Sequence, residues 1–269
     1  MQETSILNDI RSMLPVFSET ERKFAEYVLR ENELIYKSIT MATEESGVGY
    51  GTIIRFCQKL KCKGFQDFKI NLALEPSQKE SDTPPDEDSF LSSVCKDIRT
   101  VNEAIDPSVF ERAVKILVPA KKILVIGSGG SYAQAWDLCY RLTRIGFDAA
   151  AEADAHMQAI RAATLGSSDI LIAVSFSGST KGILNAVRQG KKTKAVVIAV
   201  TNYERSPLGA AADLTFCLNL RSQVLDAEIG SKIPVSFLIE VLCNRLFKSA
   251  PNAADALNLT THSVSSELF

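Results

Sequence analysis

Hydroxyl and glycine residues gather in two short stretches of the sequence, at 127–131 and 175–180. The first reads Gly-Ser-Gly-Gly-Ser and the second reads Ser-Phe-Ser-Gly-Ser-Thr. Each follows a short apolar run and precedes a helical pattern, which predicts that each connects a buried strand to a helix. A helix N-terminus has unpaired backbone N–H groups and a positive dipole end, and the hydroxyls add further donors. Phosphate is therefore the predicted ligand.

Two other interpretations of these stretches compete with phosphate binding. The first stretch resembles half of the dinucleotide fingerprint Gly-x-Gly-x-x-Gly, but Tyr132 stands where the third glycine is required. A nicotinamide is disfavoured on that ground, and no cofactor is predicted. Ordinary turns also use glycine and serine for conformational reasons. Two such stretches at corresponding strand ends of one sheet favour the phosphate interpretation.

The elements around these stretches indicate an α/β domain. Between 119 and 250, apolar strand patterns alternate with helical patterns, which predicts a doubly wound, flavodoxin-like parallel sheet. Both stretches then fall at the carboxyl ends of strands, where such sheets bind ligands. The predicted strands cover 121–126, 149–151, 169–174, 195–200 and 214–218.

The first 75 residues are predicted to be all-helical. Ser18 and Glu21 have the spacing of a capping box, and a glycine-containing turn at 47–49 separates two short helices in the proportions of a helix-turn-helix. The second of these helices is predicted from about Tyr50 to Leu60. Between 50 and 69, five lysines and arginines stand against Asp67 alone, which suits contact with DNA phosphates. A solvated basic face and a dimerisation module are the alternatives. The predicted DNA contacts are Tyr50, Thr52, Arg55, Lys59, Lys61 and Lys63.

The segment 76–89 is predicted to be a linker. It holds three prolines, five acidic residues and one lysine, and it has no aliphatic side chain to bury. The predicted domains are therefore 1–75, a helix-turn-helix domain, and 90–269, an α/β domain with two leading helices. Residues 251–269 are left open between a tail and a last helix closing over a neighbour.

Composition excludes several classes of protein. The net charge of −2 gives no overall attraction to nucleic acid, so DNA binding needs a local basic patch. The six cysteines form no Cys-x-x-Cys pair and only two histidines are present, so no metal site is predicted and the thiols are expected to be reduced. Neither a signal sequence nor a membrane span is seen, and we expect a cytoplasmic protein.

Both halves of the sequence resemble known families. The stretches 127–131 and 175–180, followed by Thr201-Asn202, Ser206-Pro-Leu208 and Ala212-Asp213, resemble sugar-isomerase (SIS) domains, which bind phosphosugars. The motifs at 52–56, 59–60 and 64–69 resemble the helix-turn-helix of the RpiR family, which joins this domain to a SIS domain in bacterial regulators of sugar metabolism. The resemblance covers about 5–250, in the family's order.

The resemblance implies a transcriptional regulator that binds double-stranded operator DNA, senses a phosphosugar, and forms a homodimer or homotetramer. It departs from the family pattern at Gly49, Gly51 and Lys61-Cys62, and Gly51 inside a helix costs about 1 kcal/mol relative to alanine. The effector-binding residues that it implies are Ser128, Gly129, Gly130, Ser131, Ser175, Ser177, Gly178, Ser179 and Thr180.

The competing hypothesis is a phosphosugar isomerase or a related SIS-domain enzyme. Such a reaction needs a general base beside the sugar carbons. The attached basic helix favours a regulator, because an isomerase has no use for it, so no catalytic residue is predicted. The candidate bases for such an enzyme are Glu152, Asp154, His156 and Glu228.

Overall fold

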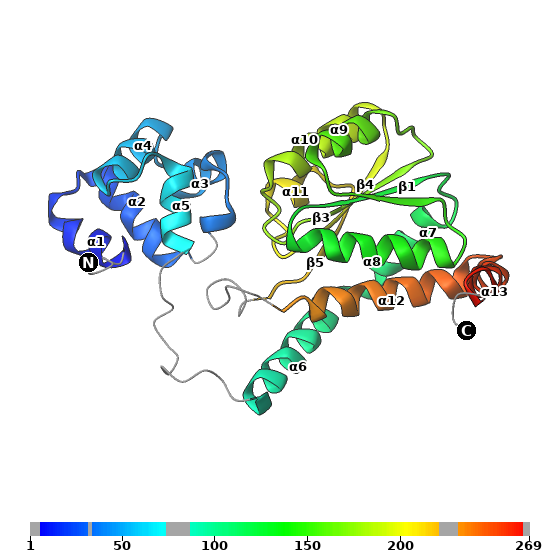
Figure 1. Cartoon of the computed structure of the whole chain (residues 1–269). Coiled ribbons are helices and arrows are strands. Elements are labelled where there is room, and N and C mark those ends of the chain that lie inside the picture. The colour runs from blue at the N-terminus through cyan, green and yellow to red at the C-terminus, as the bar shows by residue number, and fades with distance from the viewer. Residues whose placement is uncertain (1–5, 32–33, 74–86, 221–230, 266–269) are drawn as a thin grey trace. The chain divides into compact units, whose positions relative to one another are not determined.

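The computed structural model describes residues 6–31, 34–73, 87–220 and 231–265, which form two compact units (Figure 1). Among the described residues, the helical unit ends at 73 and the α/β unit begins at 87. Most of the linker predicted at 76–89 lies outside the described residues. Its last three residues belong to helix α6, which begins at Glu87, three residues before the predicted start of the domain.

The helical unit is built around phenylalanine side chains. Phe56 of the fourth helix lies at the centre, with its ring centroid 5.1 Å from that of Phe24 and 5.8 Å from that of Phe68. All three side chains are fully buried, so the central helix is held by helices before and after it in the chain. The elements are α1 (Ile6–Met13), η1 (Leu14–Val16), α2 (Glu19–Arg30), η2 (Leu34–Tyr36), α3 (Ile39–Ser46), α4 (Tyr50–Lys59) and α5 (Phe65–Ala73).

A single carboxylate, that of Glu21, joins the start of α2 to the end of α4. Its Oε2 accepts from the backbone N–H of Ser18 at 2.9 Å, which completes the capping box expected from the sequence. The same oxygen accepts from Lys59 Nζ at 2.7 Å. Burial by itself raises the pKa of Glu21, but the hydrogen bonds with Lys59 and Ser18 outweigh it and lower the pKa. The carboxylate therefore stays charged and fixes one end of α4.

The α/β unit contains a five-stranded, fully parallel sheet in the order β2-β1-β3-β4-β5. This confirms the predicted doubly wound sheet. The strands are β1 (Ile123–Gly127), β2 (Ala149–Glu152), β3 (Ile170–Val174), β4 (Val196–Thr201) and β5 (Leu214–Cys217). The helices are α6 (Glu87–Ala104), α7 (Pro107–Leu117), α8 (Gly130–Arg144), α9 (Ala155–Ala163), α10 (Lys181–Lys192), α11 (Pro207–Ala211), α12 (Ile233–Ser249) and α13 (Ala253–Ser263).

Alternate strand residues supply two separate apolar layers, one on each face of the sheet (Figure 1). On one face, Val125 and Ile172 pack in a cluster with residues of α7, α8 and α12. On the other face, Leu124 and Leu171 pack in a cluster with residues of α9, α10 and α11. Both faces are therefore covered, as parallel sheets require.

The C-terminal residues form a helix that packs on its own α/β unit. Arg144 of α8 donates to Thr260 Oγ1 at 3.1 Å and to Thr261 Oγ1 at 2.8 Å, both on α13. From the sequence, two alternatives were predicted for residues 251–269, namely a tail or a last helix closing over a neighbour. Helix α12, which α13 also contacts, was not predicted.

We predict that Gly51→Ala stabilises the helical unit by up to about 1 kcal/mol. Gly51 lies in the first turn of α4, and apart from its chain neighbours and the nearby backbone of α4 nothing described lies within 4 Å of the place that a Cβ would take, so alanine improves helix propensity without a clash. Gly47→Ala is the matched control, because Gly47 ends α3 at φ +64° and a side chain there is strained. Denaturant unfolding measures the free energy of unfolding of both variants. Equal effects of the two substitutions would contradict the placement of Gly51 inside a helix and of Gly47 at a helix end.

Candidate functional site

The two glycine-serine loops lie side by side at the carboxyl ends of two adjacent strands of the sheet. Strands β1 and β3 are neighbours, and the residue pair Gly127 and Val174 closes their ladder just before the loops begin. In the strand order observed here, the chain reverses its direction of crossover between β1 and β3. At such a switch point, flavodoxin-like sheets bind their ligands in a crevice at the carboxyl ends of the strands.

Two helix N-termini at this crevice lack a side-chain cap. Helices α9 and α11 are capped by Asp154 and Ser206, whose side chains accept from backbone N–H groups. In contrast, α8 and α10 begin after Gly129 and Thr180 with no side-chain cap hydrogen bond. Capping normally satisfies the first N–H groups of a helix. In α8, the N–H groups of Ser131 and Tyr132 donate instead to the carbonyls of Ser128 and Gly129, so the donors left for an anion are mainly those of Gly130 and of the start of α10.

The loop 175–180 is held in place by the end of β4. Phe176 O accepts from Asn202 N at 2.9 Å and from Thr201 Oγ1 at 3.1 Å. Within the loop, Ser175 Oγ and Thr180 Oγ1 lie 3.3 Å apart. The hydroxyls of Ser175 and Thr180, two of the predicted phosphate donors, are therefore brought together.

Gly178 is the residue that permits this close packing. Its φ is +60°, and a Cβ there would overlap Ser206 Oγ and lie 2.9 Å from Thr201 Oγ1. Its carbonyl accepts from Leu208 N at 2.9 Å, which joins the loop to α11. Ser177 and Ser179 lie on either side of Gly178 and are half-buried.

The loop 127–131 is equally tight. A Cβ at Gly127 would lie 2.7 Å from Ser131 O, and Gly129 has φ +55°. Ser128 and Ser131 are half-buried, whereas Gly129 and Gly130 are exposed. The loop thus presents its backbone and two hydroxyls near the start of α8.

Gln158 of α9 holds this first loop in place through a side-chain hydrogen bond. This role was not predicted from the sequence. Its Nε2 donates to Gly127 O at 2.8 Å and lies 3.0 Å from Glu152 O, so it ties the end of β1 to the end of β2. The side chain is fully buried, and its Oε1 has no hydrogen-bond partner among the described residues. A glutamine inside an amphipathic helix carries no signal of this role, because its partners lie on other elements.

Lys232, at the start of α12, was also missed. Its Nζ lies 5.5 Å from the centroid of the Phe176 ring, and its Cε lies 3.5 Å from the place of a Cβ on Gly130. One lysine thus approaches both loops. It also borders a small pocket that Ser131 and Phe176 line. Its position before an apolar helix, far from either loop in sequence, gave no indication of this.

The six residues predicted to contact DNA lie on or just after α4, the second helix of the predicted helix-turn-helix. Tyr50, Arg55, Lys61 and Lys63 are exposed, and Thr52 is half-buried. Arg55 Nη2 donates to Thr52 Oγ1 at 3.2 Å, so the guanidinium is oriented along α4. The sixth residue, Lys59, is exposed but its ammonium is paired with Glu21. Their contact with DNA stays a prediction.

Other lysines of the helical unit are buried for structural reasons. Lys37 pairs with Glu31 at 2.8 Å and with Glu45, and Glu45 also accepts from Tyr27 Oη at 2.8 Å. Burial lowers the pKa of Lys37, but the hydrogen bonds with Glu31 and Glu45 outweigh it and raise the pKa. Lys69 Nζ donates to Lys37 O at 3.0 Å, and burial lowers the pKa of Lys69. Neither lysine is available as a free surface charge.

The candidate bases of the enzyme hypothesis have other partners in the structure. Glu152 Oε1 accepts from Ala153 N at 2.9 Å, and its Oε2 lies 3.6 Å from Arg161 Nη1. Asp154 caps α9, and His156 is exposed in the first turn of that helix. Glu228 lies outside the described residues.

The cysteines are all free, and most are at least partly buried. Burial raises the pKa of Cys57 and of Cys243 to about 12, so both are protonated thiols near neutral pH.

Among the described residues, no group of three histidine, cysteine or acidic side chains is placed to hold a metal ion. In the same part of the chain, no helix has both the length and the hydropathy needed to cross a bilayer.

Comparisons with known proteins agree with this architecture. The family model for the helix-turn-helix domain of the rpiR family matches residues 4–79, and the model for the SIS domain matches residues 116–244. A helix-turn-helix transcriptional regulator of Clostridium perfringens is 32% identical over 246 residues, which cover 86% of this chain and 88% of the relative. The chain belongs to the RpiR family of transcriptional regulators.

Solved structures of RpiR-family and SIS proteins share the fold. NanR of Vibrio vulnificus, solved in complex with ManNAc-6P, is 29% identical with a TM-score of 0.81 and covers 96% of this chain and 97% of its own. The sugar-isomerase domain of an RpiR transcription factor from Sphaerobacter thermophilus is 19% identical with a TM-score of 0.59, and covers 64% of this chain and 96% of its own. The second likeness concerns the SIS fold alone.

We predict that Gly178→Ala destabilises the SIS domain by about 2 kcal/mol or more. The new Cβ combines the strain of a positive φ with overlap on Ser206, and Thr201 blocks a simple shift. Gly166→Ala is the control, because a Cβ there meets Asp169 Oδ2 at an ordinary 3.6 Å. Thermal unfolding followed by circular dichroism measures both variants. Equal midpoints for the two would show that the loop is not packed as described.

Proposed function

We propose that this protein regulates genes of sugar metabolism and that a phosphosugar, bound in the crevice of the SIS domain, controls its binding to operator DNA. The observation that carries the proposal is the pair of helix N-termini, α8 and α10, which lack side-chain caps and lie next to each other at the switch point of the sheet. The complex of the related NanR with ManNAc-6P supports a phosphosugar as the class of effector.

Both loops supply backbone N–H groups and hydroxyls in this proposal. The backbone around Gly129 and Gly130 approaches the phosphate closely, because these residues are exposed and have no side chain. Gly178 contributes by allowing the second loop to pack against Ser206 and Thr201. Lys232, which lies near both loops, adds a positive charge. The hydroxyl donors are Ser128, Ser131, Ser175, Ser177, Ser179 and Thr180.

The helical unit binds operator DNA through α4 and the turn after it. Arg55, Lys61 and Lys63 are exposed cations that suit phosphates or base edges, and Tyr50 and Thr52 stand at the start of α4. Lys59 acts mainly by fixing α4 through Glu21, so its own contribution to DNA affinity is the smallest of the four cations.

Helix-turn-helix proteins read two half-sites as dimers, so we propose a homodimer, or a homotetramer made of two such dimers. Access to the chromosome places the protein in the cytoplasm.

We propose that the SIS domain binds its sugar without converting it. Proton transfer at a sugar carbon needs a base within hydrogen-bond reach. Glu152 already accepts from backbone N–H groups and pairs with Arg161, and Asp154 is used as a helix cap. Turnover of a bound phosphosugar by the pure protein would contradict this part of the proposal.

We predict that at least one sugar phosphate raises the unfolding temperature of the wild-type protein, because a ligand of the native state stabilises it by mass action. Thr180→Val should weaken that ligand about tenfold, since one hydrogen bond to a charged group is lost. Thr193→Val, at the other end of α10, removes a hydroxyl that bonds only Gly190 O and should leave affinity unchanged. A panel of pentose, hexose and amino-sugar phosphates without any response, or an equal response to the unphosphorylated sugars, would overturn the effector site.

We predict that Arg55→Ala lowers affinity for the operator at least tenfold without unfolding the helical unit, because the exposed guanidinium bonds only Thr52 on its own helix. Operator fragments are first selected by the wild-type protein from a random-sequence library, and affinity is then measured by fluorescence anisotropy. Arg11→Ala removes the same charge from α1 and serves as the control. If the two variants bind the operator alike, α4 is not the recognition helix.

A further inference from the structure

Helix α4 has one row of exposed residues, formed by Gly51, Arg55 and Gln58. The three are separated by four and three positions, about one helical turn each, so they share one face of the helix. On the other side of α4, Ile53 and Phe56 are fully buried in the core of the helical unit. Because these core contacts fix the rotation of α4, the side chains of Arg55 and Gln58 face away from the helical unit.

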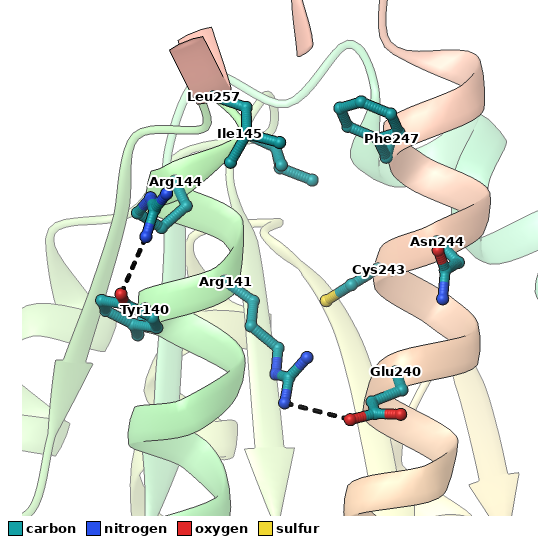
Figure 2. Close-up of a pocket in the computed structure, with 9 residues that line it drawn as sticks. All are labelled: Tyr140, Arg141, Arg144, Ile145, Glu240, Cys243, Asn244, Phe247 and Leu257. Carbon is teal, nitrogen blue, oxygen red and sulfur yellow. Dashed lines mark hydrogen bonds and ion pairs between the residues drawn. The ribbon is translucent and has the colours of Figure 1, made fainter. Parts of the chain in front are cut away.

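The guanidinium of Arg55 is not neutralised by an acid. In the α/β unit, Arg141 lies 3.3 Å from Glu240 across the groove between α8 and α12 (Figure 2). Among the described residues, no carboxylate lies within ion-pair distance of Arg55, whose side chain bonds only Thr52 Oγ1, at 3.2 Å. The remaining N–H donors of Arg55 are therefore available to a ligand outside the protein.

The bond with Thr52 orients these donors. Thr52 is half-buried in the first turn of α4, so its hydroxyl is a fixed point for the longer arginine side chain. A guanidinium presents its donors as a planar fork, and in the major groove a guanine presents two acceptors, N7 and O6, that such a fork fits. Less rotamer freedom is then lost when the contact forms.

Gln58 offers the complementary chemistry one turn further along α4. Its amide is exposed and has no hydrogen-bond partner among the described residues. The amide carries a donor and an acceptor side by side, which match N7 and N6 of an adenine in the major groove. Gln58 was not among the DNA contacts predicted from the sequence, because only basic and N-terminal positions of the helix were considered.

The spacing of the two side chains suits a base-pair step. Residues three positions apart lie about 4.5 Å apart along a helix axis, and successive base pairs lie about 3.4 Å apart along DNA. Gly51 has no side chain, and apart from its chain neighbours and the nearby backbone of α4 nothing described lies within 4 Å of the place of a Cβ. The start of α4 can therefore approach the DNA closely.

We propose that Arg55 and Gln58 read neighbouring base pairs in the major groove, a guanine by Arg55 and an adenine by Gln58, and that Thr52 is a positioning residue for Arg55. The inference rests on the DNA binding proposed above and gives it a base preference. Each operator half-site then has a guanine and an adenine within two base pairs of each other. Lys63, exposed after α4, contacts a phosphate and carries no base preference.

A base-substitution scan tests the proposal. An operator fragment selected by the wild-type protein from a random library is changed one base pair at a time, and dissociation constants are measured by fluorescence anisotropy at low salt, where weakened variants still bind. For the wild type, replacing the guanine or the adenine should raise the dissociation constant at least fivefold. Arg55→Ala should abolish the penalty at the guanine alone, and Gln58→Ala should abolish the penalty at the adenine alone. Thr52→Val should reduce the penalty at the guanine and leave the other unchanged.

Three further variants serve as controls. Gln66→Ala removes an exposed glutamine from α5 and should change neither penalty. Lys63→Ala should weaken binding to every fragment alike and keep both penalties. Gln58→Arg should change the preferred base at its position from adenine to guanine, a gain that a misfolded protein cannot give. Circular dichroism checks the fold of each variant.

Each outcome bears on a different statement. A wild-type protein that enriches no sequence from the library overturns the proposed DNA binding and this inference with it. An enriched operator whose base penalties persist in both Arg55→Ala and Gln58→Ala overturns the base-reading roles alone. Equal loss of both penalties in Thr52→Val overturns the positioning role of Thr52, because a structural effect on α4 would not distinguish the two bases.

Discussion

The reversal of crossover direction between β1 and β3 is the constraint on which the SIS domain depends. It sends α8 and α10 to opposite faces of the sheet while keeping the strands before them adjacent, so both helices start at the same place. Two loops separated by more than forty residues thereby share one crevice. Gly178 lets the second loop lie against β4, and Gln158 holds the first loop to β2. Neither loop alone offers more than an ordinary turn.

Two kinds of observation, one from the sequence and one from the structure, concern the same crevice. The match to the rpiR and SIS models rests on sequence, whereas the missing side-chain caps of α8 and α10 are a property of the structure. Helices α9 and α11 of the same domain begin at capping side chains, whereas α8 begins after Gly129, which has no side chain that could cap it.

Sequence reasoning succeeded where structure is decided locally. The apolar runs at 169–174 and 195–200, and the capping box of Ser18 and Glu21, are read from neighbouring residues, and the structure confirms them. It failed where the interacting residues lie far apart in the sequence. Lys232 approaches loops more than fifty residues away, and Lys59 is paired with Glu21, so counting charges between 50 and 69 overstated the free positive charge. Helix α12 was missed because apolar residues lie on its exposed face as well as its buried one, which hides the amphipathic period.

The buried residues of the chain fall into cores that share no member. One core lies wholly within residues 6–72, and the two layers around the sheet lie wholly within residues 101–253. A damaging substitution in the phenylalanine cluster therefore leaves the packing of the sheet untouched, and the reverse also holds. In evolutionary terms, the part that reads DNA and the part that holds the sugar can drift at separate rates. A lineage can then acquire a new operator by exchanging the first part without having to rebuild the second.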